Sequence, residues 1–244
     1  LTDVTGVQTC ALPISKVSIP EGSYAGVVFR ATVSGIGFSE VNTSEGFFTL
    51  LNIKEFGLRN AEGEPALPVY RKLIEVPLGA TYSVRIRHSH VTEIDLGQHG
   101  IRFPVFPSQP PLSKSDDPDK VPFIINKALY NTDRYIEDEL VTVTNIGLMR
   151  ALNLARVDIS PVQYNPVTQI LRIYDDLEIE IVFEHADIQG TEDLKVSKAS
   201  PYFISTYKMA ANYRSPGPDD ALITSAPATR SEEHTSELQS RQSI

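Results

Sequence analysis

Apolar and polar residues alternate along much of this chain, and this pattern constrains its fold more than any other feature. The clearest case is the segment 177–183, in which Leu177, Ile179, Ile181 and Phe183 share one face while two glutamates and a valine occupy the other. Period-two alternation with one apolar face is typical of a β-strand in a sheet that is buried on one side. Comparable windows, rich in β-branched and aromatic residues, lie at 24–33, 46–53, 72–76, 82–88, 140–144, 153–159 and 169–174.

Turn residues separate these windows and indicate how the strands connect. Pro166 follows Asn165 at the second position of a type I turn, so we expect segments 157–164 and 169–174 to form a hairpin. The pair Asp175-Asp176 then predicts a turn into the next strand, which would complete a three-strand meander. Strands about 8 to 12 residues apart with turns between them favour an all-β fold, an antiparallel, jelly-roll-like β-sandwich.

One helix is expected, near the C-terminal end of the sandwich. Ser200 is a helix cap with Pro201 at the first helical position, and apolar side chains recur on one face up to residue 211. The polar segment 189–198 before it is expected to be a loop, and the proline-rich run after it a linker. We therefore expect a sandwich at 16–198, helix and linker at 199–214, and the start of a further domain at 215–229.

Composition excludes several partners. The formal net charge is -9 and the basic residues form no cluster, which argues against binding to nucleic acid or to anionic lipid. No apolar run approaches the roughly 20 residues that span a bilayer, so no membrane insertion is expected. A single cysteine excludes a disulfide framework and a cysteine-rich zinc site.

The two ends of the chain resemble translated sequencing adapter. Residues 4–14 and 230–240 match the two complementary strands of one adapter read in frame, and the flanking residues fit one barcode and its reverse complement. We therefore expect 1–15 and 230–244 to be non-native, and the native fragment to run from about Lys16 to about Thr229. A secretion signal would then be missing because the native N-terminus is missing.

Residues that could carry chemistry are few. His88 and His90 share a strand face but lack a third ligand, so two surface histidines are favoured over a metal site. Three aspartates at 116, 117 and 119 lack the spacing of a calcium loop and are interpreted as a solvated turn. Asp175-Asp176 has no opposing carboxylate for acid–base work. No phosphate-binding loop or serine elbow is present, so we expect neither a cofactor nor a metal.

A proline-rich loop is the unusual segment. Residues 104–111 contain four prolines, and Lys114 is the cation that follows them. Prolines hold such a loop extended and reduce the entropy lost on docking. The loop therefore has two interpretations: a pseudosubstrate that presents Lys114 to a basic-specific site, or a plain connection between two sheets.

Several motifs resemble the N-terminal prodomain of gingipain-type cysteine peptidases. They are Gly63-Glu64-Pro65-Ala66-Leu67-Pro68, Glu75-Val76-Pro77-Leu78-Gly79-Ala80, the segments 107–122 and 130–135, and above all Ser160-Pro161-Val162-Gln163-Tyr164-Asn165-Pro166-Val167-Thr168 with Leu171-Arg172-Ile173-Tyr174. The similarity covers about residues 16–213. It implies a β-sandwich that precedes a caspase-like catalytic domain, keeps the zymogen latent and assists its folding.

The resemblance also implies site residues and a location. Lys114, flanked by Ser113 and Ser115, stands where arginine-specific members carry a blocking arginine, and Arg214 is the candidate processing site, with Lys198 and Lys208 as alternatives. The catalytic histidine and cysteine would lie beyond this chain, so the fragment itself would not be an enzyme. Its partner would be the cognate catalytic domain in cis, in a protein secreted by, or on the surface of, a Gram-negative bacterium. The alternative function is a cell-surface β-sandwich adhesin that binds glycan or protein.

Overall fold

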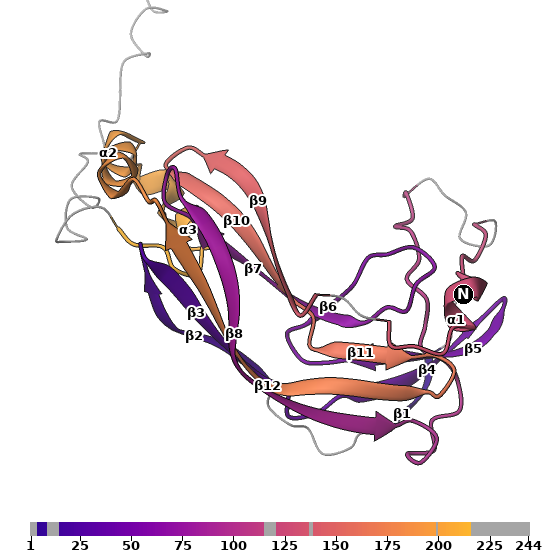
Figure 1. The fold of residues 1–244 in the computed structure, drawn as a ribbon. Helices are drawn as coiled ribbons and strands as arrows, with labels where there is room; N and C mark the ends of the chain where they lie inside the picture. Colours follow the sequence, from indigo (N-terminus) through magenta and orange to yellow (C-terminus); the bar gives the residue numbers. More distant parts are fainter. Residues whose placement is uncertain (1–3, 9–14, 115–120, 137–138, 199, 216–244) are drawn as a thin grey trace, which may run out of the picture.

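The computed structural model describes residues 4–8, 15–114, 121–136, 139–198 and 200–215. The chain forms a bent, strand-rich molecule whose two halves are joined by two long strands (Figure 1). Its strands are β1 (Val4–Gln8), β2 (Lys16–Ser23), β3 (Gly26–Thr32), β4 (Gly37–Thr43), β5 (Gly46–Asn52), β6 (Gly57–Leu58), β7 (Pro68–Glu75), β8 (Thr81–Asp95), β9 (Val141–Met149), β10 (Leu152–Ile159), β11 (Val162–Asn165) and β12 (Ile170–Glu184).

The described strands form three sheets, and every named pair of strands is antiparallel. The sheets have the orders β1-β4-β5, β6-β7-β10-β9 and β11-β12-β3-β2, with β8 added alongside β12. Mostly antiparallel sheets followed by a short C-terminal helix confirm the predicted all-β class. Adjacent antiparallel strands leave each sheet one face to bury, which is what the alternating sequence requires.

Strand β12 corrects the expected turn at Asp175-Asp176. The strand runs uninterrupted from Ile170 to Glu184, and its pairing with β8 skips one residue between Tyr174 and Asp176. Asp175 is therefore the extra residue of a β-bulge, and its carbonyl accepts a hydrogen bond of 2.9 Å from Val33. The two acidic residues favour a turn in the sequence, but here they lie within a continuous strand. The strand continues because β8 pairs with one of its edges and β3 with the other.

The hairpin around Pro166 is confirmed, but its first strand is shorter than expected. The Asn165 side chain accepts hydrogen bonds from the N–H groups of Val167 and Thr168, and β11 pairs with β12 beyond this turn. The expected strand 157–164 is divided, since β10 ends at Ile159 and β11 begins at Val162 in another sheet. Pro161 lies at the division, where its lack of an N–H interrupts a ladder.

Two main hydrophobic cores fill the space between the sheets, and β12 contributes to both. The first core takes Leu177, Ile179, Ile181 and Phe183 from β12, together with residues of β3, β7 and β10. The second takes Leu171 and Ile173, with residues of β5, β11 and the loop at 96–105. All six side chains are buried, and the four from segment 177–183 form the predicted apolar face.

The helices differ most from expectation. Segment 189–198, expected to be a loop, lies in helix α2 (Ile188–Lys198), whose buried residues are Thr191 and Lys195. The predicted helix after Ser200 is reduced to a 3₁₀ turn at Pro201–Phe203 and α3 (Ile204–Tyr207). Helix α2 was missed because its buried face is polar, so it lacks the apolar period that marks a helix in sequence. A further short helix, α1 (Lys127–Tyr130), follows the proline-rich loop.

A third, smaller cluster anchors the C-terminal segment. Tyr207 and Ala210 are buried against Ala151, Leu152 and Leu154 at the end of the β9–β10 hairpin. Within the described residues, no helix is long and apolar enough to cross a membrane.

Candidate functional site

The proline-rich loop begins as an extended segment held against strand β5. Thr49 donates its N–H to the Pro104 carbonyl at 2.7 Å and accepts from the Phe106 N–H at 2.8 Å. The Thr49 hydroxyl also donates to the Phe103 carbonyl at 2.8 Å. Because prolines supply no N–H, this segment bonds to Thr49 through the carbonyls of Phe103 and Pro104 and the N–H of Phe106.

The base of the loop is closed by the side chain of Gln109. Its amide nitrogen donates to the Ile124 carbonyl at 2.7 Å, and its amide oxygen accepts from the Ile124 N–H at 2.9 Å. Gly63 supports this closure, because its carbonyl accepts from Asn126 and its N–H donates to Ser108. The two ends of the loop 110–123 are therefore joined at one place.

Aromatic side chains packed against one another stabilise the same base. The rings of Phe48, Phe106 and Phe123 contact one another with centroids 5.4 to 6.1 Å apart. Beneath them the Tyr130 hydroxyl donates to the Val105 carbonyl at 2.6 Å, and burial raises the pKa of this tyrosine. The pKa of Tyr164 is raised to about 12, also by burial, so both phenols stay neutral at physiological pH.

Lys114 lies beyond this base on an exposed turn, and Ser113 before it is also exposed. Ser115 and the three aspartates at 116, 117 and 119 lie outside the described residues. The described parts of the loop, 110–114 and 121–123, lie at the end of the molecule opposite helix α2 (Figure 1). The structure thus combines an exposed lysine with a firmly held base.

The strand histidines pair with acids instead of with each other. His90 Nδ1 lies 2.6 Å from Asp175 Oδ1, and His88 Nε2 lies 3.6 Å from Asp176 Oδ2. Desolvation alone would raise the pKa of Asp175, but hydrogen bonds from Thr92 and His90 hold it below its usual value. The described part of the chain holds no group of three His, Cys, Asp or Glu residues that could bind a metal ion.

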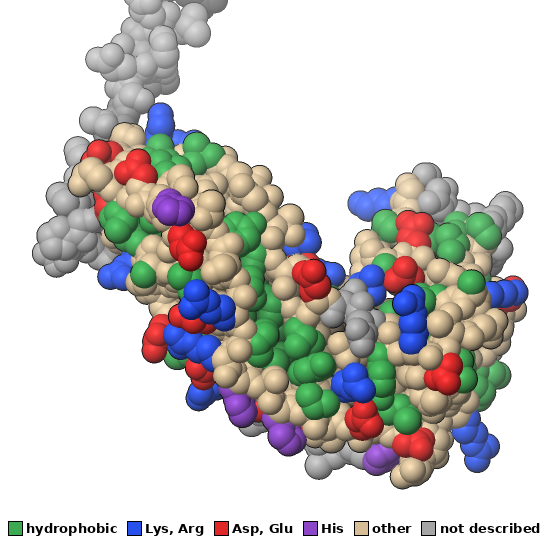
Figure 2. Space-filling view, in the orientation of Figure 1, with side chains coloured by type: hydrophobic (Ala, Val, Ile, Leu, Met, Phe, Trp, Pro, Cys, Tyr) green, Lys and Arg blue, Asp and Glu red, His purple; other side chains and the backbone are tan. Residues whose placement is uncertain are grey.

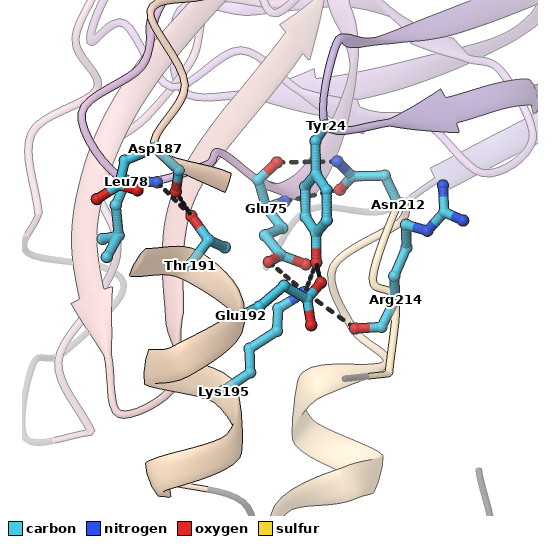
Figure 3. Close-up of polar contacts among 9 residues, drawn as sticks. All are labelled: Tyr24, Glu75, Leu78, Asp187, Thr191, Glu192, Lys195, Asn212 and Arg214. Atoms are coloured by element: carbon cyan, nitrogen blue, oxygen red, sulfur yellow. Dashed lines mark hydrogen bonds and ion pairs between the residues drawn. The ribbon is translucent and has the colours of Figure 1, made fainter. Parts of the chain in front are cut away.

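Arg214, the candidate processing site, lies at the opposite end and belongs to a polar cluster that the sequence did not reveal (Figure 3). We call this cluster the Lys195 pocket: Tyr24, Glu75, Glu192, Lys195 and Asn212. Its members come from the β2–β3 turn, the end of β7, helix α2 and the C-terminal segment. The side chain of Arg214 is exposed, whereas its backbone carbonyl accepts a hydrogen bond of 2.9 Å from Lys195 Nζ.

A buried ion pair lies at the centre of the Lys195 pocket. Lys195 Nζ and Glu75 Oε1 are 2.6 Å apart, and each side chain is only 2% exposed. Burial raises the pKa of Glu75 even though Lys195 opposes the shift. Tyr24 accepts from Lys195 at 2.9 Å and donates to Glu192, and burial together with this hydrogen bond raises the Tyr24 pKa. The ammonium of Lys195 thus finds oxygen partners on three different elements.

Sequence reasoning could not find this pocket. Glu75 lies in the expected strand 72–76 and Lys195 in a segment expected to be a loop, so no local pattern predicts that either charge is buried. The one available signal is the spacing of Thr191 and Lys195, which are four residues apart and share a helix face. This spacing indicates a shared helix face only once helix α2 is known.

Known proteins resemble this chain in sequence. A family model described as Propeptide_C25 matches residues 13–201. Lys-gingipain of Porphyromonas gingivalis is 34% identical over 200 residues, which cover 82% of this chain and 12% of that protein. Gingipain R2 of the same species is 26% identical over 196 residues, covering 80% of this chain and 25% of that protein.

Two solved structures share the fold. A structure that addresses zymogenic latency of gingipain K from Porphyromonas gingivalis matches with a TM-score of 0.67 and 32% identity, covering 76% of this chain and all of that one. A complex of the pro- and mature domains of RgpB from the same species matches with a TM-score of 0.60 and 23% identity, covering 75% and 95%. At that identity the second likeness shows the fold alone.

These matches define the class of protein to which the chain belongs: a β-sandwich propeptide domain without catalytic chemistry of its own. The chain belongs to the Propeptide_C25 family. Membership confirms the resemblance to gingipain-type prodomains and favours it over the adhesin alternative. The chain spans only 12% to 25% of the length of these relatives, so it corresponds to one part of such proteins.

Proposed function

We propose that this prodomain inhibits a gingipain-like cysteine endopeptidase and assists its folding, with Lys114 occupying the specificity pocket. The observation that carries the proposal is an exposed Lys114 on a loop whose base is closed by Gln109 and Ile124. A loop that is already ordered at its base loses little entropy when it docks, so more of its interaction energy appears as affinity. Ser113 and Ser115 would flank the lysine in the pocket.

The partner in this proposal is the cognate catalytic domain, joined in cis beyond the C-terminal segment. Cleavage at Arg214 would separate the two. The parent protein would be exported, to the medium or to the cell surface, because its relatives come from Porphyromonas gingivalis and the family resemblance implies secretion. Lysine in place of arginine at the tip favours a pocket that accepts a compact ammonium.

Titration against active peptidase tests this proposal. The chain would be added to the catalytic domains of Lys-gingipain and gingipain R2, and hydrolysis of lysyl and arginyl substrates measured. We expect the wild-type chain to inhibit and Lys114→Ala to weaken inhibition about 30-fold or more, because removing one partner of a desolvated charge pair costs at least about 2 kcal/mol. The matched control is Lys127→Ala, which removes another exposed lysine close in sequence to the loop.

Two outcomes separate the parts of the proposal. Wild-type chain that leaves hydrolysis unchanged at micromolar concentration would contradict an inhibitory role. Inhibition that survives Lys114→Ala intact would contradict only the role of Lys114 and would assign the inhibition to other surfaces of the sandwich.

A further inference from the structure

The C-terminal segment is attached to strand β7 like a short additional strand. Ala211 donates its N–H to the Leu73 carbonyl at 2.8 Å, and Ala210 forms a parallel bridge with Leu73. Asn212 then bonds twice to the backbone of Glu75: its side-chain oxygen accepts from the Glu75 N–H at 2.7 Å, and its nitrogen donates to the Glu75 carbonyl at 2.8 Å (Figure 3). Segment 210–214 is therefore held in a defined position and does not hang free.

Space for this attachment is provided by Gly22. A β-carbon on Gly22 would lie 3.0 Å from Cβ of Asn212, which is closer than side chains normally approach. The strand β2 therefore passes directly beside the asparagine that holds the segment. Because Gly22 has no side chain, β2 leaves room for Asn212 beside it.

The side chain and the backbone carbonyl of Arg214 differ in their accessibility. Its side chain is exposed, and this is the part that a basic-specific protease recognises. Its carbonyl, which a protease nucleophile must attack, accepts instead the hydrogen bond from buried Lys195. The bond between Arg214 and Ser215 can therefore be recognised in the folded chain, but its carbonyl is already engaged.

Loss of the Arg214 carbonyl would leave Lys195 without one of its hydrogen-bond acceptors. Lys195 Nζ has three donors, and its oxygen partners are Glu75, Tyr24 and the Arg214 carbonyl. If segment 210–214 detached, a buried ammonium would lose one partner, and an unsatisfied buried donor is costly. Proteolysis of a folded protein proceeds through the open state, so its rate follows the population in which the segment is detached.

Resting on the proposed role of Arg214 as processing site, we propose that the Lys195 pocket is a latch that protects the Arg214–Ser215 peptide bond from proteases until segment 210–214 detaches. Lys195 is then a positioning residue, which acts on cleavage through the carbonyl it holds. The latch makes release of the prodomain depend on the folded state of the sandwich to which the segment is attached.

Limited trypsinolysis of the full chain tests the latch without a gingipain-type enzyme. Mass spectrometry would follow cleavage after Arg214, with cleavage after exposed Arg102 as an internal reference. In the double variant Glu75→Leu/Lys195→Met both charges are replaced by apolar side chains, a change that folded proteins tolerate better than loss of one partner. We expect cleavage after Arg214 to accelerate at least about tenfold relative to Arg102, corresponding to a tenfold larger open population.

Asn212→Ala provides a second variant that leaves the buried charges in place. It removes both bonds to the Glu75 backbone and should accelerate cleavage in the same direction. The matched control is Arg30→Gln, which breaks an exposed ion pair with Glu178 on the sheet and should leave the rate unchanged. Circular dichroism would establish that each variant is folded.

The latch would be overturned by either of two results. One is an unchanged Arg214 rate in folded Asn212→Ala or in the folded double variant. The other is a wild-type rate at Arg214 equal to that of a synthetic peptide spanning residues 208–219. Because trypsin is the protease, failure of inhibition by Lys114 would leave this result untouched, and failure of the latch would not affect the inhibition assay.

Discussion

At the scale of single residues, the loop that carries Lys114 depends on Gly63. The backbone of Gly63 has a φ of +76°, and an added β-carbon would lie 3.0 Å from the Asn126 nitrogen and 3.2 Å from a methyl carbon of Ile124. The glycine is needed both for its conformation and for the close approach of the segment that closes the loop. It belongs to the motif that carried the family resemblance, whose structural purpose the sequence did not reveal.

Gly63→Ala should destabilise the chain more than Gly100→Ala does. Both glycines have a φ of +76°, but a β-carbon at Gly100 meets nothing within 4 Å. We expect about 1 kcal/mol of lost unfolding free energy at Gly100 from the left-handed backbone alone, and at least about 1 kcal/mol more at Gly63. Urea unfolding measures both. Equal losses at the two positions would mean that the approach of segment 124–126 to Gly63 does not matter energetically.

Residue patterns predicted some of the site and missed the rest for a clear reason. The exposure of Lys114 follows from a proline-rich polar loop, since such segments run over the surface. The burial of Glu75 and Lys195 does not follow, because a charged residue is buried only where a partner is brought to it by the fold. Glu75 and Lys195 lie far apart in the chain, and no local pattern links them.

At the scale of elements, strand β12 shows how a local signal is overridden. Asp175-Asp176 favours a turn, yet β8 pairs with the strand both before and after this point, and β3 pairs with it from Asp176 onward. The same bulge places Asp175 beside Thr92 and His90 on the exposed face. Helix α2 shows the reverse case, because it is a helix without the apolar period that predicts one from sequence. Its buried Thr191 accepts a hydrogen bond from the Leu78 N–H instead of packing in a hydrophobic core.

The bulge should make stability depend on acid through Asp175. Despite desolvation, hydrogen bonds from Thr92 and His90 hold the pKa of Asp175 below its usual range, so its ionised form contributes stability that is present at neutral pH and is lost as pH falls through the lowered pKa. Asp175→Asn should cost less than about 1 kcal/mol at neutral pH, because the Asp175 side chain is 27% exposed and that of His90 64%, so solvent screens the pair. The difference in Tm between variant and wild type should narrow from about pH 5 to about pH 3.

Thermal unfolding across this pH range measures the effect, and Asp176→Asn is the matched control. Asp176 lies next in sequence but 3.6 Å from its histidine, without the paired hydrogen bonds that Asp175 receives. A Tm difference for Asp175→Asn that stays constant with pH would show that Asp175 is not a source of acid sensitivity.

At the scale of the whole molecule, the two main cores share two strands. Strands β8 and β12 pair along nearly their whole length, and β12 supplies buried residues to both cores. The alternating pattern predicted the sheets and the buried face, but it could not predict that one strand serves two cores, because 169–174 and 177–183 read as separate strands. The exposed face is visible in Figure 2, where side chains of both charges lie over the region of these strands.

This sharing predicts a single cooperative unfolding transition. Ile181→Ala in the first core and Ile173→Ala in the second should each cost about 2 to 5 kcal/mol and should each shift the same transition. Far-UV circular dichroism and hydrogen exchange in each half would report it, with Val167→Ala at an exposed turn position as the control. Two separate transitions, each sensitive to one substitution, would show that the halves fold independently.

Strand β8 carries one more consequence. Among the strands that the structure describes, it pairs only with β12, so its outer edge offers backbone groups to any other chain in solution. Long unpaired edges are sites of aggregation, and natural proteins blunt them with charged side chains and bulges. Strand β8 has both, since Arg85 and Arg87 lie along it and its pairing with β12 is interrupted twice. Charged side chains and bulges along this edge therefore disfavour edge-to-edge pairing of β8 with another chain.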